Sequence, residues 1–311
     1  MTVSSVTNAN LTTIKIINQA MTIAGIKKRS LDLDSEDYVT AKIQLEAMLA
    51  HWQAQGLNQH LSSMVTLVLE PNKAEYLLGS TAHCTETLYQ QKLTSAAVAT
   101  TSVISVDSTT GLTIGDNIGV WLGTGWHWTT INNISSLDIS LTTALPSDAS
   151  NGAAVYVYTN KIARPLRVKE GYRIESNSNV ELCILSRQEY YGMDISSYGA
   201  TVQIYYDPKR ENVGHLHIWP QPQLYAPTTL LLHVQRPAFI PQVNGDTLDL
   251  PQEWMMAVIY NLALQCGVAW GVSGETMARI EVMANTYYRQ IRAFDREQDT
   301  VLTFKPKLGS Y

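Results

Sequence analysis

The sequence predicts an α+β protein: a helical bundle formed by the N- and C-terminal helices, an antiparallel β domain between them, and an inserted small β-barrel-like module. Three observations support this class. Apolar residues recur at helical spacing near both chain ends, and they alternate in the middle. Residues 88–159 contain one lysine, Lys92, but no arginine or glutamate. We therefore expect a bundle from residues 1–62 and 250–298, a β domain from 63–87 and 160–249, an insertion at 88–159, and an extended tail at 299–311.

The composition excludes several classes of protein. The 311 residues are enough for two domains with sizeable cores. A net charge of -5 lacks the basic excess of a dedicated nucleic-acid-binding protein. Cys84, Cys183 and Cys266 are scattered without C-x-x-C spacing, so we expect buried apolar cysteines, with no disulfide or zinc site. Charged residues make up only 16%, which favours a subunit whose faces are covered by partners.

Two segments bear on membranes and targeting. Residues 1–10 are polar and lack the basic segment followed by an apolar segment that marks a signal peptide, so we expect none. Residues 254–274 carry no charge and are long enough to cross a bilayer. Apolar residues within them nevertheless recur at alternating spacings of four and three, which indicates a buried helix and no membrane span. These residues are Met255, Ile259, Leu262, Cys266 and Ala269.

Two helices are predicted before the first strand. The first ends near Gly25, a residue type that closes helices. The second begins after Asp34, because Asp34 or Ser35 can cap it and acidic residues follow in the first turn. Their apolar stripes are Ile14, Ile17, Met21 and Ala24 in the first helix, and Leu45, Met48, Leu49 and Trp52 in the second.

The remaining elements follow from alternation, turns and caps. We expect roughly five short strands in the insertion, a hairpin whose arms are YYDP (205–208) and HLHIWP (215–220), and a short helix starting at Ser186. Pro251 is expected as the first residue of the helix that follows it. After a break at residues 271–274, the last helix carries the stripe Met277, Ile280, Ala284, Tyr287, Ile291 and Phe294.

No catalytic or cofactor-binding motif is present in the sequence. We find no nucleophile elbow, P-loop, zincin motif or dinucleotide fingerprint. His215 and His217 face the same side of one strand, as two metal ligands would, but no third ligand is evident. We interpret the pair as a packing feature and predict no metal site, no cofactor and no enzyme activity. Four glutamates lie where ordinary surfaces are expected: Glu170, Glu175, Glu181 and Glu189.

Trp126, His127 and Trp128 are the candidate recognition residues of the insertion. Flat rings beside glycines can stack on sugars, which would make a glycan-binding platform. Alternation places Trp126 and Trp128 on the same face of a strand, so we favour a barrel core with an exposed ring.

The order of five segments resembles a known family. They are AKIQLEAMLAHWQAQGL, YLLG, VELCILSRQEYYGM, IYYDP followed by HLHIWPQP, and LDLPQEWMMAVIYNLALQCGVAWG. Together they resemble the head-to-tail adaptors of short-tailed phages, also called tail accessory factors or packaged-DNA stabilisation proteins. The resemblance covers residues 10–87 and 160–298. The insertion looks like a small β module that recurs in phage neck and tail proteins.

The resemblance implies a structural protein of the virion neck, assembled in the host cytoplasm. About twelve copies would form a ring under the portal protein. The ring would extend the DNA channel, help to retain the genome and offer a platform to tail nozzle or tail fibre proteins, while double-stranded DNA passes without sequence-specific binding. We expect the C-terminal tail to contact the portal through Leu302, Phe304, Lys305, Lys307 and Tyr311. The alternatives are a glycan- or receptor-binding virion protein that uses the insertion, and a glycan hydrolase.

Overall fold

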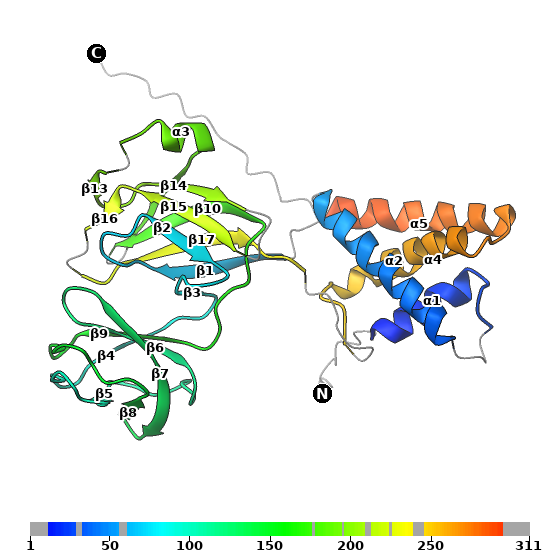
Figure 1. Cartoon of the computed structure of the whole chain (residues 1–311). Helices are drawn as coiled ribbons and strands as arrows, with labels where there is room; N and C mark the ends of the chain where they lie inside the picture. Colours follow the sequence, from blue (N-terminus) through cyan, green and yellow to red (C-terminus); the bar gives the residue numbers. More distant parts are fainter. Residues whose placement is uncertain are drawn as a thin grey trace, which may run out of the picture. The chain divides into compact units, whose positions relative to one another are not determined.

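The computed structural model confirms the mixed α+β class, with strands predominating (Figure 1). It describes residues 12–28, 33–55, 61–175, 178–194, 196–208, 213–223, 226–238 and 246–294. The chain divides into two compact units. Residues 1–61 and 238–311 form the helical unit, and residues 62–237 form the β unit.

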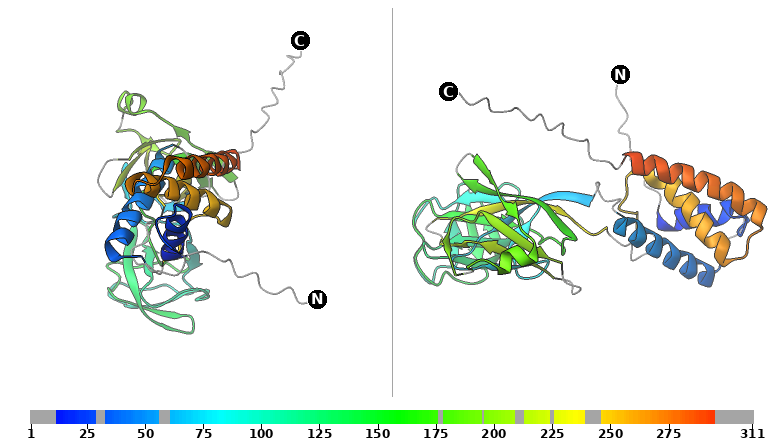
Figure 2. Two further views of the ribbon diagram at one scale, coloured as in Figure 1. Left: turned by 90° about the vertical axis from the view of Figure 1, so that its right-hand side faces the viewer. Right: turned by 90° about the horizontal axis from the view of Figure 1, so that it is seen from above.

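The described residues of the helical unit include four α-helices and a short 3-10 segment that leads into α4. They are α1 (Thr13–Ile23), α2 (Ser35–Ala54), η2 (Gln252–Trp254), α4 (Met255–Ala269) and α5 (Gly274–Phe294). Helix α4 contacts each of the other three helices and runs alongside α5, as Figure 2 shows. Both ends of the chain contribute to one hydrophobic core, because Ile17 of α1, Met48 of α2 and Leu262 of α4 all belong to it.

The helix ends follow from local chemistry. The Asp34 carboxylate accepts a hydrogen bond from the Ser35 amide at 2.7 Å and caps α2. Gly25 after α1 and Gly271 before α5 have positive φ values of 76° and 66°, which a residue with a side chain rarely adopts. The predicted breaks at these glycines therefore have a backbone cause.

Three sequence predictions for the helices were wrong in detail. Ile14 is 38% exposed, because α1 buries the neighbouring stripe that contains Ile16 and Ala20. Ala269 is exposed at the last turn of α4, where the next residue, Trp270, packs against the core instead. Pro251 lies before η2 as its cap, with an extended ψ of 149°, and is not itself helical.

Two sheets share one core in the β unit. The five-stranded sheet has the order β11-β10-β17-β1-β3, and the four-stranded sheet has the order β12-β14-β15-β2. Buried side chains from both sheets pack together, including Leu67, Leu232 and Leu216. The strands are β1 (Ser62–Val68), β2 (Glu75–Leu78), β3 (Cys84–Thr85), β10 (Arg167–Glu175), β11 (Ser178–Glu181), β12 (Cys183–Ile184), β14 (Gln203–Asp207), β15 (Gly214–Trp219) and β17 (Thr229–Gln235).

A hairpin, a short helix and a small two-stranded sheet belong to this sandwich. The expected hairpin is the antiparallel pair β14–β15, with Tyr205 directly opposite His217. The expected short helix is α3 (Arg187–Tyr191), which starts after Ser186. A small two-stranded sheet joins β13 (Tyr198–Gly199) to β16 (Gln221–Pro222).

The insertion folds as a six-stranded sheet with its own core, in the order β4-β9-β6-β7-β8-β5. A bridge between Leu93 and Val106 links the ends of β4 and β5, so the sheet curls back on itself. The expectation of roughly five strands missed β4 and the full length of β7. The strands are β4 (Tyr89–Lys92), β5 (Val103–Ser105), β6 (Asn117–Trp121), β7 (Trp126–Ser135), β8 (Asp138–Leu141) and β9 (Ala154–Tyr158).

The two ends of the insertion lie side by side. The chain leaves the sandwich after β3, which ends at Thr85, and returns after β9, which ends at Tyr158. The amide of Ile162 then donates a hydrogen bond to the carbonyl of Cys84 at 3.0 Å. The Lys161 ammonium, beside Ile162, also donates hydrogen bonds to the carbonyls of Ser80 and Thr81, so entry and exit are joined by several hydrogen bonds.

Two further sequence expectations concern membranes and cysteines. Among the described helices, none combines the length and apolarity that crossing a bilayer requires. Cys84 and Cys266 are buried, as expected, but Cys183 is exposed. Cys183 lies on β12, an edge strand only two residues long, whose side chains do not reach the core.

Candidate functional site

The predicted recognition residues lie where the insertion meets the sandwich. Trp126 and Trp128 share one face of β7, as alternation predicted, and their ring centroids are 5.6 Å apart. The Trp126 indole Nε1 donates a hydrogen bond to the Leu69 carbonyl at 3.0 Å. The Trp128 indole stacks on the imidazole of His83, 3.7 Å between centroids and 6° from parallel. These contacts hold the insertion against the sandwich. We call the group of rings that makes them the aromatic contact; its members are His83, Trp126, Trp128, Tyr156 and Tyr158.

His127 belongs to the opposite face of β7. Its Nε2 lies 3.3 Å from the Thr143 hydroxyl and 3.4 Å from the Thr143 carbonyl. The structure therefore separates the three consecutive residues: the two tryptophans face the sandwich, and the half-buried histidine lies on the face of β7 that carries Ile131 and the insertion's own core.

The aromatic contact is electrically neutral near pH 7. Burial, reinforced by the positive charges of Lys161 and Lys73, lowers the pKa of His83 to about 3. Its Nδ1 lies 2.7 Å from the Tyr158 hydroxyl, whose own pKa is raised by burial. A neutral imidazole between two aromatic rings serves packing. It does not provide a proton donor at physiological pH.

A second cluster lies on the outer face of the four-stranded sheet, under α3. Ser186 and Glu189 form a reciprocal capping box that starts this helix. The helix places Tyr190 over the His217 imidazole, 5.2 Å between ring centroids. Tyr205 of β14 stacks on the same imidazole at 5.5 Å and 12°.

Glu75 of β2 joins the two predicted histidines of β15. Its carboxylate is hydrogen-bonded to His215 Nδ1 and lies 3.9 Å from His217 Nε2. One ligand atom from each of the three residues lies within 4.8 Å of the others, an arrangement that could hold a metal ion. Sequence reasoning placed the histidines on one face but missed Glu75, which is 140 residues away from His215 along the chain.

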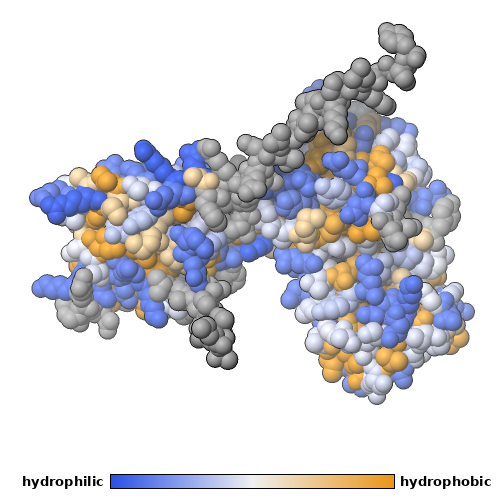
Figure 3. Space-filling view, turned by 180° about the vertical axis from the view of Figure 1, so that it is seen from behind, coloured by the Kyte–Doolittle hydropathy of each residue, from blue (hydrophilic) through white to orange (hydrophobic). Residues whose placement is uncertain are grey.

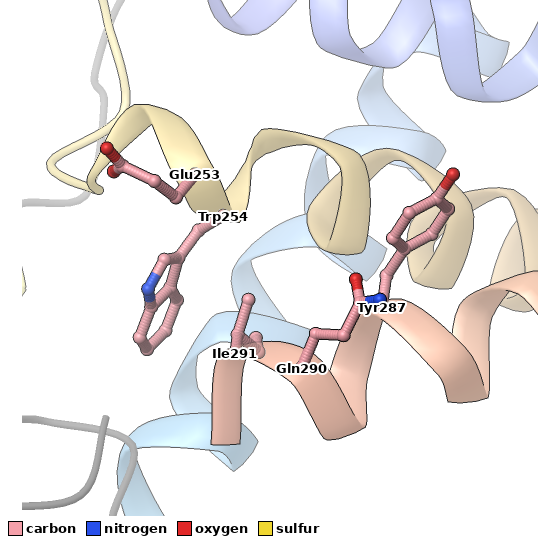
Figure 4. Close-up of a pocket in the computed structure, with 5 residues that line it drawn as sticks. All are labelled: Glu253, Trp254, Tyr287, Gln290 and Ile291. Carbon is pink, nitrogen blue, oxygen red and sulfur yellow. The ribbon is translucent and has the colours of Figure 1, made fainter. Parts of the chain in front are cut away.

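The helical unit carries a small open pocket of about 230 Å³. It lies between the start of α4 and the C-terminal half of α5, and Figure 4 shows the Trp254 indole beside Ile291. Trp254 also contacts Trp52 edge-on at 6.4 Å, so one side of this pocket is part of the core. Trp254, Tyr287 and Ile291 give the pocket apolar walls, and Glu253 and Gln290 add polar groups to its lining.

The predicted portal-contact residues lie outside the described residues. These are Leu302, Phe304, Lys305, Lys307 and Tyr311. Their role stays a prediction from the resemblance.

Comparisons with known proteins do not assign a family. The chain matches no family model, and no curated protein matches it significantly. The Gp54 tailspike of Acinetobacter baumannii bacteriophage AP22, solved in complex with capsular saccharide, is similar over 23% of this chain at 11% identity and a TM-score of 0.21. The similarity spans only 15% of the tailspike's length.

A second solved structure is similar over a longer stretch. VP17, a capsid protein of bacteriophage P23-77, aligns with 57% of this chain and 72% of its own length, at 12% identity and a TM-score of 0.12. TM-scores this low do not establish a shared fold.

Proposed function

We propose that the protein is a structural subunit of a head-to-tail adaptor ring in a short-tailed phage, without catalytic activity. The segments that resemble the adaptor family occupy defined elements of both units. The AKIQLEAMLAHWQAQGL segment lies in and just after α2, and the S-R-Q-E-Y segment builds the capped start of α3. The LP-x-E-W segment leads through η2 into α4.

The observation that carries the proposal is an apolar outer face on the helical unit. Helix α2 buries Leu45, Met48 and Trp52 on its inner side. Its outer side nevertheless exposes Val39 by 55% and Ile43 by 58%. These two residues are one helical turn apart and therefore adjacent.

Other helices of the unit expose apolar side chains as well. Val282 of α5 is 65% exposed. Figure 3 shows hydrophobic side chains reaching the surface of the helical unit on the face opposite that of Figure 1. A lone subunit gains nothing from such surfaces, whereas neighbouring copies in a closed ring cover them.

The proposed ring has three partners: the portal, the tail proteins and the DNA in the channel. In it, residues 299–311 contact the portal, and the ring offers a platform to tail nozzle or tail fibre proteins. The net charge of -5 suits a channel wall that lets double-stranded DNA slide, because like charges do not hold the phosphates. The proposed place of the ring is the virion neck.

The test is the native mass of the purified protein, alone and after mixing with the portal ring encoded in the same phage genome. We expect the portal complex to gain about twelve subunits, one closed ring. A portal complex of unchanged mass would contradict the adaptor role. Deletion of residues 299–311 should abolish portal binding and leave the circular dichroism spectrum unchanged, and full binding by the truncated chain would contradict the role of the tail.

A pair of variants tests the side-by-side contact. Val39→Lys combined with Ile43→Lys places two charges on the outer face of α2, and we expect fewer subunits per portal. Thr40→Lys is the control, because Thr40 is exposed on the same helix but is not part of the apolar stripe. Equal stoichiometry for the double variant and the control would contradict the use of this face.

A further inference from the structure

The pairing of two strands brings Glu75, His215 and His217 together. His215 and His217 are two residues apart on β15, so both rings project from the same face of the sheet. Glu75 lies directly opposite His217 on the neighbouring strand β2. The intervening residues Leu216 and Tyr76 point to the other face and are fully buried in the core. The sheet register therefore brings all three side chains to one place.

The distances suit a shared ion. Zinc binds histidine nitrogen and carboxylate oxygen at about 2.0–2.2 Å, which places neighbouring ligand atoms roughly 3.3 Å apart in a tetrahedral site. His215 Nδ1 already contacts the Glu75 carboxylate, and His217 Nε2 is 3.9 Å from it. Small side-chain rotations are enough to close the cluster around an ion, because the ligand atoms start within 4.8 Å of one another.

Neighbouring rings hold the His217 side chain in place, whereas the Glu75 side chain can move. The His217 ring stacks against Tyr205 and also contacts Tyr190, and only 14% of its side chain is exposed. Glu75 is 47% exposed and can turn its carboxylate toward an ion. The same exposure gives water access to the remaining coordination positions.

We propose that Glu75, His215 and His217 bind one divalent transition-metal ion, with Zn²⁺ as the best match and water completing its coordination. Two imidazoles and one carboxylate are the ligands that zinc takes in proteins, whereas Mg²⁺ and Ca²⁺ take oxygen ligands. The ion links β2, the edge strand of the four-stranded sheet, to β15 beside it. This site does not depend on the proposed adaptor role.

The test uses the full chain without a polyhistidine tag, dialysed against a chelator and titrated with ZnCl₂ by calorimetry. We expect one equivalent of Zn²⁺ to bind to the wild type. His217→Phe keeps an aromatic ring for Tyr205 to stack on but removes a ligand nitrogen, so affinity should fall by at least the roughly 10–100-fold that loss of a second-shell partner costs. Glu75→Gln preserves shape and removes the anionic ligand, so it should also weaken binding.

The matched control is His233→Phe. His233 lies on β17 of the same unit, 3.9 Å from Glu170, in a pair that is not part of the three-residue cluster. This variant should bind Zn²⁺ as the wild type does. Absorption of bound Co²⁺ gives a second readout of the coordination, because loss of a ligand changes the spectrum.

Several results would overturn the proposal. These are a wild type that binds no Zn²⁺, unchanged affinity in both His217→Phe and Glu75→Gln, or an equal loss in His233→Phe. Circular dichroism identifies any variant that fails to fold. If His217→Phe does not fold, Glu75→Gln alone decides, because its substitution is close to isosteric.

Discussion

The imidazole of His83 lies flat on the indole of Trp128, although the two residues belong to parts of the β unit with separate cores. His83 immediately precedes β3 of the sandwich, and Trp128 lies on β7 of the insertion. Their ring planes differ by 6°. The insertion is therefore held by a specific aromatic stack in addition to its two chain connections.

The stability of the β unit should decrease as the pH falls below about 6.5. The unfolded chain binds a proton on His83 near its ordinary pKa of 6.5, whereas the folded chain does so only near a pKa of about 3. Because the unfolded state binds more protons in this interval, acid favours unfolding. Between pH 7 and pH 5 this group alone should remove about 2 kcal/mol, measured by urea unfolding followed by tryptophan fluorescence.

His83→Phe is the control for that measurement. Phenylalanine keeps a flat ring on Trp128 but does not titrate. The variant should show a smaller loss of stability between pH 7 and pH 5 than the wild type. Identical pH dependence in the two proteins would show that His83 titrates normally in the folded state.

Gly119→Ala should disturb the same stack from the neighbouring strand. Gly119 is paired with Trp128 across β6 and β7, and an added Cβ would lie 2.6 Å from the Trp128 ring. Because the Trp128 ring would have to shift from its stacked position, we expect a loss of about 1–3 kcal/mol in the free energy of unfolding. Gly125→Ala is the control, since a Cβ there meets no atom within 4 Å. Equal stability of the two variants would contradict the tight fit of Trp128.

Trp128→Ala distinguishes a packing role from glycan recognition. If Trp128 serves packing, the substitution should lower the free energy of unfolding by about 3 kcal/mol, measured by thermal or urea unfolding. His127→Ala, on the other face of β7, should be close to neutral. A glycan-binding protein would instead lose binding on a glycan array while keeping its stability, and that result would favour the alternative function.

Ser186→Ala should loosen α3 without unfolding the β unit. The Ser186 hydroxyl accepts a hydrogen bond from the Glu189 amide at 3.3 Å, and the Glu189 carboxylate accepts one from the Ser186 amide at 2.7 Å. Loss of the hydroxyl should cost about 1 kcal/mol of helix stability. Faster hydrogen exchange at the amides of α3 would report it, and Ser186→Thr should restore protection. Unchanged exchange in the alanine variant would show that the cap is dispensable.

Features with local chemical causes were predictable from the sequence. Asp34 caps α2 and Ser186 starts α3, because a cap depends on the few residues beside it. The hairpin β14–β15 followed from alternation in each strand. The α+β class followed from the change of period along the chain.

Features that depend on tertiary packing were not predictable. The stripe predicted for α1 is buried except at Ile14, because periodicity alone does not fix where the edge of a buried helix face lies. Glu75 was missed as a neighbour of His215 and His217, since the sequence does not give the register between β2 and β15. The exposure of Cys183 likewise follows from its place on a short edge strand.

The hydrogen bond between Ile162 and Cys84 has an evolutionary consequence. Because the chain leaves the sandwich and returns to it at one place, residues between these points can be lost, gained or exchanged without rethreading β1, β10 or β17. A recombination event that replaces this segment alters one surface of the protein and preserves the sheets beneath it. The sandwich can therefore accept a different inserted domain at this position while its own strands stay the same.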